Sequence, residues 1–155
     1  MKIAVGSDHR GLTYKKYIIN LLNEMDHVFK DFGSYSEDAV DYPDIAAAVS
    51  DAIVKSEFDC GILICGTGIG MSIAANKVQG IRAALCCDNF AAQRARSHND
   101  ANIICLGAER GEEGVKEILQ TFLTTQFESG RHQKRLDKIS RMEASNNIFH
   151  SKSTP

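Results

Sequence analysis

Short apolar runs alternate with segments of helical periodicity along the whole chain, and this alternation restricts the fold more than any other feature. The clearest run, Gly61-Ile62-Leu63-Ile64-Cys65, is apolar throughout, which is typical of a strand that is covered on both faces of a sheet. Further strands are predicted at 2–7, 27–32, 81–86 and 102–106, and helices at 11–25, 43–55, 71–77, 89–96, 112–125 and 131–145. This pattern predicts a doubly wound (Rossmann-like) α/β fold, with a five-stranded parallel sheet, helices on both faces as an αβα sandwich, and an additional C-terminal helix.

The length of 155 residues is enough for one domain. We expect this domain to span residues 1–146 and residues 147–155 to form a flexible C-terminal tail. The C-terminal helix has no obvious place on a sheet whose faces are already covered, which hints at a partner subunit.

The charge balance argues against several classes of function. Lys plus Arg number 18 and Asp plus Glu number 20, so the net charge is −2. A nucleic-acid or membrane-surface role driven by bulk charge is therefore not expected. The longest apolar stretches, 60–65 and 81–87, are too short to cross a bilayer, and the N-terminus has no signal-peptide pattern.

Five cysteines stand at positions 60, 65, 86, 87 and 105 without a Cys-x-x-Cys pair or a Cys/His spacing for zinc. An odd number of thiols, mostly in apolar runs, is typical of reduced cysteines in a cytosolic protein. We therefore expect a cytoplasmic location, no disulfide framework and no bound metal.

Two loops carry polar groups at the carboxyl ends of predicted strands, where open parallel sheets bind ligands. Asp8-His9-Arg10-Gly11 follows the first strand, and Gly66-Thr67-Gly68-Ile69-Gly70 follows Cys65 at the end of the third. Both loops lead into helix N-termini, whose free N–H groups favour negative charge.

The glycine loop has three functional interpretations. A dinucleotide fingerprint needs Gly-x-Gly-x-x-Gly after the first strand, and this loop has Gly-x-Gly-x-Gly after the third. A Walker loop needs Gly-Lys-Ser/Thr, which is not present here. The third interpretation is a nest of backbone N–H groups for an oxyanion or a phosphate. A tight turn without a ligand remains open as the structural alternative.

Cys65 ends a strand and faces a helix N-terminus, a setting that favours the thiolate form. Such a thiolate could act as a base or a nucleophile, whereas the structural alternative is a small buried hydrophobe. We assign that structural role to Cys60, Cys86, Cys87 and Cys105.

The residues alone do not decide the roles of two polar clusters. His98 and Asn99 stand in a predicted short connection, either as catalytic groups or as surface residues. Arg131 and Arg135 are four residues apart, so on a helix they would share one face. They could clamp a phosphate or form a solvated basic face.

Six motifs occur in an order that resembles the type B ribose-5-phosphate isomerases, within the wider sugar-phosphate isomerase family that includes galactose-6-phosphate isomerase. The similarity covers about residues 2–145. The motifs are Gly-Ser-Asp-His-Arg-Gly at 6–11, Asp-Tyr-Pro at 41–43, Cys-Gly-Thr-Gly-Ile-Gly-Met-Ser-Ile-Ala-Ala-Asn-Lys at 65–77, Gly-Ile-Arg-Ala at 80–83, His-Asn-Asp at 98–100 and Gly-Arg-His-Gln-x-Arg at 130–135.

This resemblance implies interconversion of D-ribose 5-phosphate and D-ribulose 5-phosphate in the non-oxidative pentose phosphate pathway, without a metal or organic cofactor. It implies that Cys65 moves a proton between carbon 1 and carbon 2 through an enediolate, since Met71 stands where other members carry a glutamate base. Thr67 would hydrogen-bond sugar oxygens and relay a proton. The backbone N–H groups that would hold the enediolate oxygens are those of Gly66, Gly68, Ile69 and Gly70.

The resemblance also implies roles for the remaining motif residues. His98 would open the furanose ring, and Asn99 would contact the sugar. Arg131 and Arg135 would bind the phosphate. Other substrate contacts are expected from Asp8, from His9 towards the phosphate end, and from Tyr42 lining the pocket.

One departure affects the phosphate site implied by the family. Family members often carry an arginine at the position of Glu109, and in this chain Arg110 stands one place later. Arg110 could substitute after a local shift, or the phosphate site could be weaker.

His98 and Asn99 precede a strand, whereas Asp8 and Cys65 follow strands, so the two pairs are expected at opposite rims of the sheet. We therefore expect a homodimer or tetramer whose active sites are shared between subunits. Two alternative functions stay open: isomerisation of a six-carbon 6-phosphate of allose or galactose, or a non-catalytic, flavodoxin-like nucleotide-binding module.

Overall fold

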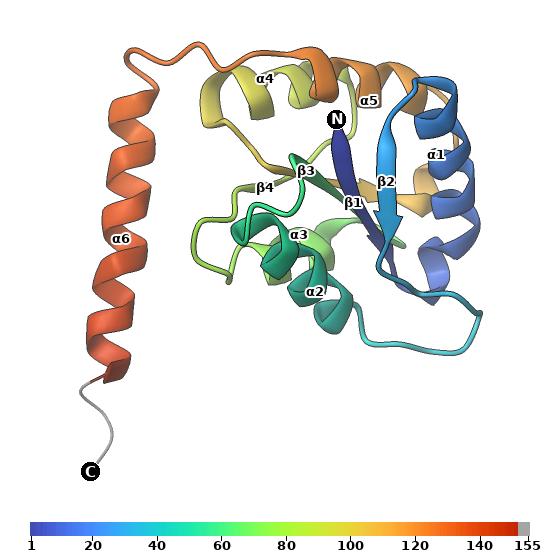
Figure 1. The fold of residues 1–155 in the computed structure, drawn as a ribbon, viewed down its shortest axis with the longest axis horizontal. Coiled ribbons are helices and arrows are strands. Elements are labelled where there is room, and N and C mark those ends of the chain that lie inside the picture. The colour runs from blue at the N-terminus through green and yellow to red at the C-terminus, as the bar shows by residue number, and fades with distance from the viewer. Residues whose placement is uncertain (152–155) are drawn as a thin grey trace.

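The computed structural model describes the backbone of residues 1–151 and the side chains of residues 1–145. Its strands are β1 (Lys2–Ser7), β2 (Val28–Asp31), β3 (Cys60–Cys65), β4 (Ala83–Leu85) and β5 (Ile103–Gly107) (Figure 1). The α-helices are α1 (Leu12–Glu24), α2 (Tyr42–Val54), α3 (Ile69–Ala75), α4 (Asn89–Asn99), α5 (Val115–Thr124) and α6 (Gln133–Ser151). Two short 3-10 helices follow β1 and β5, namely η1 (His9–Gly11) and η2 (Ala108–Arg110).

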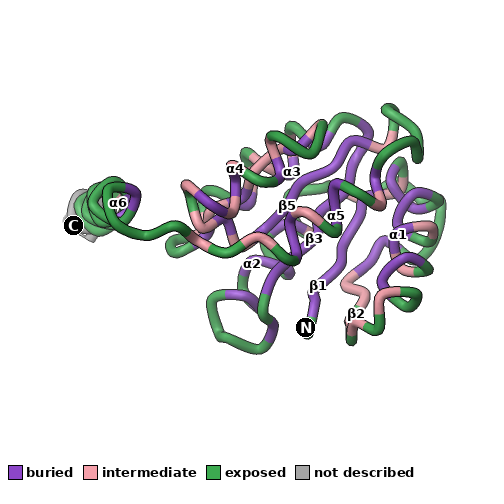
Figure 2. Tube along the Cα trace, turned by 90° about the horizontal axis from the view of Figure 1, so that it is seen from above, coloured by how far each residue is buried: buried purple, intermediate pink, exposed green. Residues whose placement is uncertain are grey.

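The strands form one parallel sheet in the order β2-β1-β3-β5-β4, with helices on both faces, which confirms the predicted doubly wound α/β fold. β3 is the central strand, and every one of its residues is buried. Figure 2 shows the strands buried between exposed helix surfaces. This position explains why the run at 61–65 is apolar without alternation.

Side chains of the central strand point alternately to two separate hydrophobic clusters. Ile62 and Ile64 pack with α1, α4 and α5, whereas Leu63 and Cys65 pack with α2 and α3. The strand therefore delivers the Cys65 side chain to the α2–α3 face, at the carboxyl end of the sheet.

The C-terminal end of α4 differs from the prediction. The helix was expected to end at residue 96 but continues to Asn99, because the chain leaves the helical conformation only at Asp100, which has a φ of 43°. His98 and Asn99 thus lie in the last turn of a helix rather than in a connection.

The boundaries of α6 also differ from the prediction. Left-handed conformations at Ser129 and Gly130 delay its start to Gln133, so Arg131 lies in the preceding turn. The helix continues to Ser151, past the expected end near Ser145, because no glycine or proline interrupts this stretch. Part of the expected tail is therefore helical here, and residues 152–155 lie outside the described residues.

α6 stands away from the sheet, as Figures 1 and 2 show. The amide of Gly80 donates to Glu143 Oε2 of α6 at 3.3 Å. A groove of about 460 Å³ lies between α6 and the rest of the domain. Ile139 and Met142 line this groove opposite Ile81.

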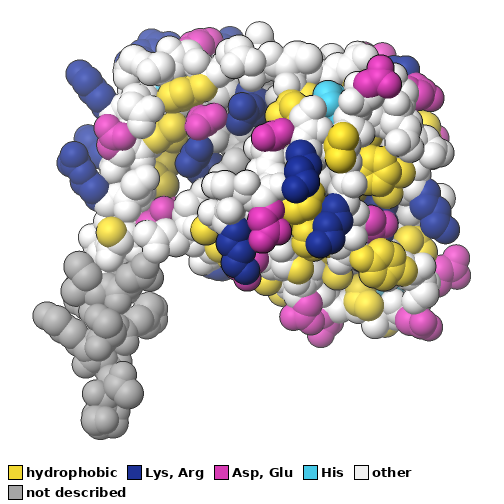
Figure 3. Space-filling view, viewed as in Figure 1, with side chains coloured by type: hydrophobic (Ala, Val, Ile, Leu, Met, Phe, Trp, Pro, Cys, Tyr) yellow, Lys and Arg dark blue, Asp and Glu magenta, His cyan; other side chains and the backbone are white. Residues whose placement is uncertain are grey.

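Among the helices of residues 1–151, none combines the length and apolarity of a membrane span. Acidic and basic side chains are interspersed over the face in Figure 3.

Candidate active site

The carboxyl ends of β1 and β3 form a crevice, because the chain leaves these neighbouring strands towards opposite faces of the sheet. Asp8 follows β1, and its amide donates to the Ile64 carbonyl of β3 at 3.1 Å. Cys65 is the last residue of β3. The structure therefore brings the two predicted loops together at one rim of the sheet.

The glycine loop directs a backbone amide at the Cys65 sulfur. Gly68 N donates to Cys65 Sγ at 3.2 Å, and Ile69 N donates to Thr67 Oγ1 at 3.3 Å. Gly68 has a φ of 77°, and a Cβ at this position would lie 2.6 Å from Leu85 Cδ1. Only glycine fits such a turn, and an amide donor at sulfur stabilises a thiolate.

Three of the other cysteines, Cys60, Cys86 and Cys105, lie in settings that keep them protonated. Burial raises the pKa of the Cys60 and Cys86 thiols to about 12, and burial also raises the pKa of Cys105. These three thiols therefore carry almost no thiolate at neutral pH. The Cys65 side chain is itself only 6% exposed, and it differs from them by its contact with the loop amide.

Asp8, His9 and Tyr42 lie at the same rim as Cys65. Asp8 Oδ1 accepts the Gly11 amide at 2.9 Å, which closes η1. Val40 N donates to His9 Nδ1 at 3.3 Å, so a neutral His9 ring carries its proton on Nε2 and can donate it to a ligand. The Tyr42 ring lies against Gly70, where a Cβ would be 2.7 Å from Tyr42 Cζ.

The structure shows where Glu109 and Arg110 lie, and so whether Arg110 can take the place of an arginine at position 109. Glu109 forms an ion pair with Arg10, directly over Gly66. Arg110 instead lines a cavity of about 180 Å³ with Tyr14. Arg110 therefore takes no place at the glycine loop.

A second cluster lies where strands begin. The rings of His98 and His132 stack with centroids 4.1 Å apart and planes 15° apart. Glu128 Oε2 is 3.7 Å from His98 Nε2 and 3.6 Å from His132 Nε2. Arg94 Nη1 lies 3.0 Å from His98 Nε2, and Arg131 Nε donates to His132 Nε2 at 3.3 Å.

The pKa of His132 is lowered by burial and by the positive charges of His98, Arg131 and Arg135, against an opposing effect of Glu128. The side chain of Arg135 is exposed on α6, close enough to act on this ring. The structure thus gathers the predicted residues 98, 131 and 135 around a ring that favours its neutral form.

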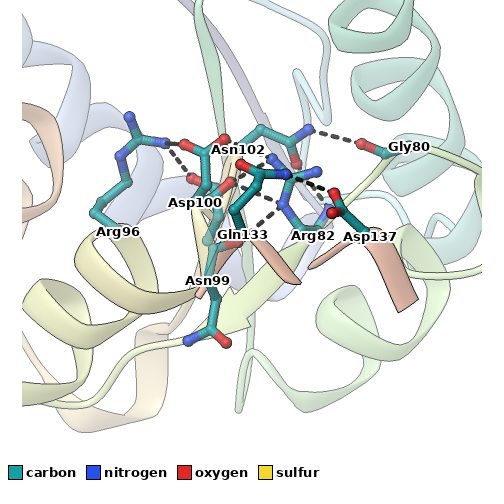
Figure 4. A network of polar contacts seen from close by, with 9 residues as sticks. Gly80, Arg82, Arg96, Asn99, Asp100, Asn102, Gln133 and Asp137 are labelled. Carbon is teal, nitrogen blue, oxygen red and sulfur yellow. Dashed lines mark hydrogen bonds and ion pairs between the residues drawn. The ribbon is translucent and has the colours of Figure 1, made fainter. Parts of the chain in front are cut away.

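Asn99 belongs to the same end of α4. Arg82 Nε donates to the Asn99 carbonyl at 2.9 Å, and Arg82 Nη2 bonds Asp100 Oδ2 at 2.8 Å. Figure 4 shows the Asn99 amide directed away from Arg82. This network fixes the last turn of the helix and with it the orientation of His98.

His98, Glu128 and His132 are the residues whose spacing could hold a metal ion in the described part of the chain. Their geometry does not suit one, because lone pairs of two nearly parallel rings do not converge on a common point. Arginine nitrogens also stand beside both Nε2 atoms. The cluster is suited to an anionic or hydroxylated ligand instead.

One chain does not bring the two groups of predicted residues together. In Figure 1 the connection from α5 to α6 runs along the edge where β1 begins, whereas Cys65 and Asp8 lie where strands end. His132 has no predicted role, although it belongs to the Gly-Arg-His-Gln-x-Arg motif at 130–135. Its stacking on His98 depends on how that connection packs against α4, which no local pattern encodes.

Comparisons with known proteins agree on one family. A family model described as Ribose/Galactose Isomerase matches residues 3–139. The chain is 44% identical to ribose-5-phosphate isomerase B of Escherichia coli over 147 residues, covering 94% of this chain and 99% of that protein. The structure resembles ribose-5-phosphate isomerase B of Clostridium thermocellum with a TM-score of 0.92, 45% identity and coverage of 94% and 99%. It also resembles the Mycoplasma genitalium enzyme with bound ribulose 5-phosphate, with a TM-score of 0.86, 44% identity and coverage of 92% and 96%.

Proposed function

Because this chain belongs to the ribose/galactose isomerase family, we infer that it interconverts D-ribose 5-phosphate and D-ribulose 5-phosphate as an aldose–ketose isomerase. We further propose that this reaction belongs to the non-oxidative pentose phosphate pathway, which the similarity to ribose-5-phosphate isomerases supports. The observation that carries the mechanism is the Cys65 sulfur at the carboxyl rim, bonded by the amide of Gly68.

We propose that the Cys65 thiolate is the base. It takes the proton from carbon 2 of the open-chain aldose, and the electron pair left behind forms the carbon–carbon double bond of an enediolate. The thiol then returns the proton to carbon 1, which completes the ketose. A positioned base of this kind contributes about 10²–10⁴-fold in rate.

The loop that follows Cys65 would hold the developing negative charge. Backbone N–H groups that are already oriented stabilise an oxyanion without reorganisation, and each contributes about 10²–10³-fold. Thr67 would relay a proton between sugar oxygens, since its hydroxyl lies beside the loop amides. The donors proposed for the sugar oxygens are the amides of Gly66, Gly68, Ile69 and Gly70, of which Gly68 N donates to Cys65 Sγ and Ile69 N to Thr67 Oγ1 in this structure.

Ring opening would use the other cluster. His98, stacked on His132, is proposed to transfer the proton that opens the furanose, and Asn99 to bind the sugar. Arg131 and Arg135 would bind the phosphate. Since these residues lie at the opposite rim from Cys65, we propose a homodimer or tetramer in which a second copy supplies them.

The remaining contacts come from the rim that carries Cys65. Asp8 and His9 would bind the substrate, His9 through its Nε2 proton, and Tyr42 would line the pocket beside Gly70.

We also propose a single domain over 1–146 that acts in the cytoplasm. The five unpaired thiols support a reducing compartment.

Turnover of ribose 5-phosphate in D₂O tests this proposal. We expect deuterium in the product and a drop in kcat of about 10²–10⁴-fold for Cys65→Ala, with KM largely kept. Cys87→Ala is the matched control, because Cys87 is a half-buried thiol outside the glycine loop. Wild-type turnover by Cys65→Ala would overturn the assignment of the base.

A side-by-side rate comparison on ribose 5-phosphate, allose 6-phosphate and galactose 6-phosphate tests the substrate. We expect the five-carbon phosphate to have the highest kcat/KM. A preference for either six-carbon phosphate would contradict the assignment of substrate and leave the chemistry of Cys65 intact.

A further inference from the structure

An ion pair spans the crevice above the glycine loop. Arg10 comes from η1 after β1, and Glu109 comes from η2 after β5, so the pair joins loops on either side of the one that follows Cys65. A Cβ at Gly66 would lie 2.7 Å from Glu109 Oε1 and 3.3 Å from Arg10 Cζ. The amide of Glu109 also donates to the Gly66 carbonyl at 2.9 Å, which fixes the carboxylate over this loop.

The pair has little to contribute to stability. The two side chains are 63% and 51% exposed, and ion pairs in such settings add little to the free energy of unfolding. Glu109 engages Nη2 of the guanidinium. Within the described residues, Nη1 and Nε of Arg10 bond to no other group, so its planar fork keeps donors for a second anion.

We propose that Arg10 binds the phosphate group of the substrate and that Glu109 is the positioning residue that holds the guanidinium over the loop. The inference rests on the proposed function, in which the substrate is a sugar phosphate. Carbons 1 and 2, which react, and the phosphate are at opposite ends of a short sugar. When carbons 1 and 2 are at the Cys65 sulfur, the phosphate must therefore lie a short distance to one side of this base. Arg10 packs on Gly66, the residue next to Cys65, which meets that requirement.

Arg110 provides the contrast. It is an exposed arginine in the same 3-10 helix as Glu109, but it lines the cavity beside Tyr14 instead of the loop. Arg10 is therefore the arginine through which the rim carrying Cys65 would contact a dianion. With Arg131 and Arg135 from a second copy, the phosphate would be bound by arginines of two chains.

Steady-state kinetics on Arg10→Ala, Arg10→Lys and Arg110→Ala test this role, with inorganic phosphate as a competitive inhibitor. Loss of a charge-assisted hydrogen bond raises a dissociation constant by about 10- to 100-fold. We expect that rise in both KM and the inhibition constant of phosphate for Arg10→Ala, with kcat within a factor of about three. Arg10→Lys should recover part of the loss, since lysine keeps the charge without the fork. Arg110→Ala should behave as wild type.

Two results would overturn the inference. One is an Arg10→Ala variant with unchanged KM and phosphate inhibition. The other is a fall in kcat with unchanged KM, which would indicate that the Arg10–Glu109 ion pair supports the glycine loop and does not bind the phosphate. Binding of inorganic phosphate to wild type and Arg10→Ala by calorimetry gives a readout that needs no turnover. Absence of ribose 5-phosphate turnover in the wild type would therefore contradict the proposed function without deciding the role of Arg10.

Discussion

At the scale of single residues, one thiol among five is separated from the rest by its surroundings. Cys60 and Cys105 lie inside the sheet, and Cys86 is buried beside it, so ionising them would place a charge in an apolar setting. Cys65 ends its strand where a backbone amide reaches the sulfur. The same side-chain type thus serves packing in one place and, under the proposed mechanism, proton transfer in another.

This difference predicts a selective reaction with iodoacetamide. At about pH 8, a thiol with a pKa of about 12 is thiolate in roughly 10⁻⁴ of molecules, so Cys60 and Cys86 should stay unmodified. We expect alkylation of Cys65 to proceed ahead of both and to abolish turnover, as followed by peptide mass spectrometry. Labelling of Cys60 at the rate of Cys65 would be inconsistent with this assignment.

His132 predicts how stability changes with pH. Burial, reinforced by neighbouring positive charges, lowers the pKa of this ring in the folded protein, so the unfolded chain takes up the proton first as pH falls. The free energy of unfolding should therefore decrease as pH drops through the ordinary histidine value of about 6.5 and level off below the folded pKa.

Thermal unfolding of wild type and His132→Gln between about pH 5 and pH 8 checks this prediction. We expect a smaller fall in Tm for the variant, because glutamine has no proton to take up. Equal slopes in the two proteins would show that His132 does not contribute.

At the scale of elements, the turn between β3 and α3 depends on a backbone conformation that glycine supplies. Gly68 and Gly114 both have a positive φ, of 77° and 73°, and both precede helices. A Cβ at Gly68 would lie 2.9 Å from the Leu106 carbonyl carbon, whereas a Cβ at Gly114 would meet nothing within 4 Å.

The two glycines form a matched pair of alanine variants. Gly114→Ala should destabilise the fold by about 1 kcal/mol from conformational strain alone. Gly68→Ala should cost about 2–4 kcal/mol, since the clash with backbone adds to the strain, and it should reduce kcat by displacing the amide at Cys65. Urea unfolding measures both variants, and equal losses would contradict the packing argument.

Sequence patterns predict the elements better than the contacts between them. The apolar run at 61–65 identifies the central strand, β3. Local periodicity also marks where β1 and β3 end, so it correctly predicts that Asp8 and Cys65 lie at the carboxyl rim of the sheet. The true end of α4 depends on Asp100, whose left-handed conformation is held by Arg82 and Arg96. Such a network joins distant segments, so periodicity alone places the helix end too early.

At the scale of the whole molecule, the two clusters lie at opposite ends of parallel strands in one chain. A mixture of a Cys65→Ala chain and a His98→Asn chain tests whether they meet in an assembly. Each variant alone should be nearly inactive, and in an equal mixture of dimers about a quarter of the wild-type activity should return, because half the dimers hold one intact site of two. If the refolded mixture stays as inactive as its components, the shared site is wrong.

The separation of the two rims also has a consequence for how activity depends on the amount of protein. Under the shared-site proposal, a newly made chain holds every reactive group and can turn over nothing until it meets a sister chain. At high dilution, the initial rate would then grow with the square of protein concentration instead of in proportion to it. A synthesised and folded chain would therefore become active only after it associates with a second chain.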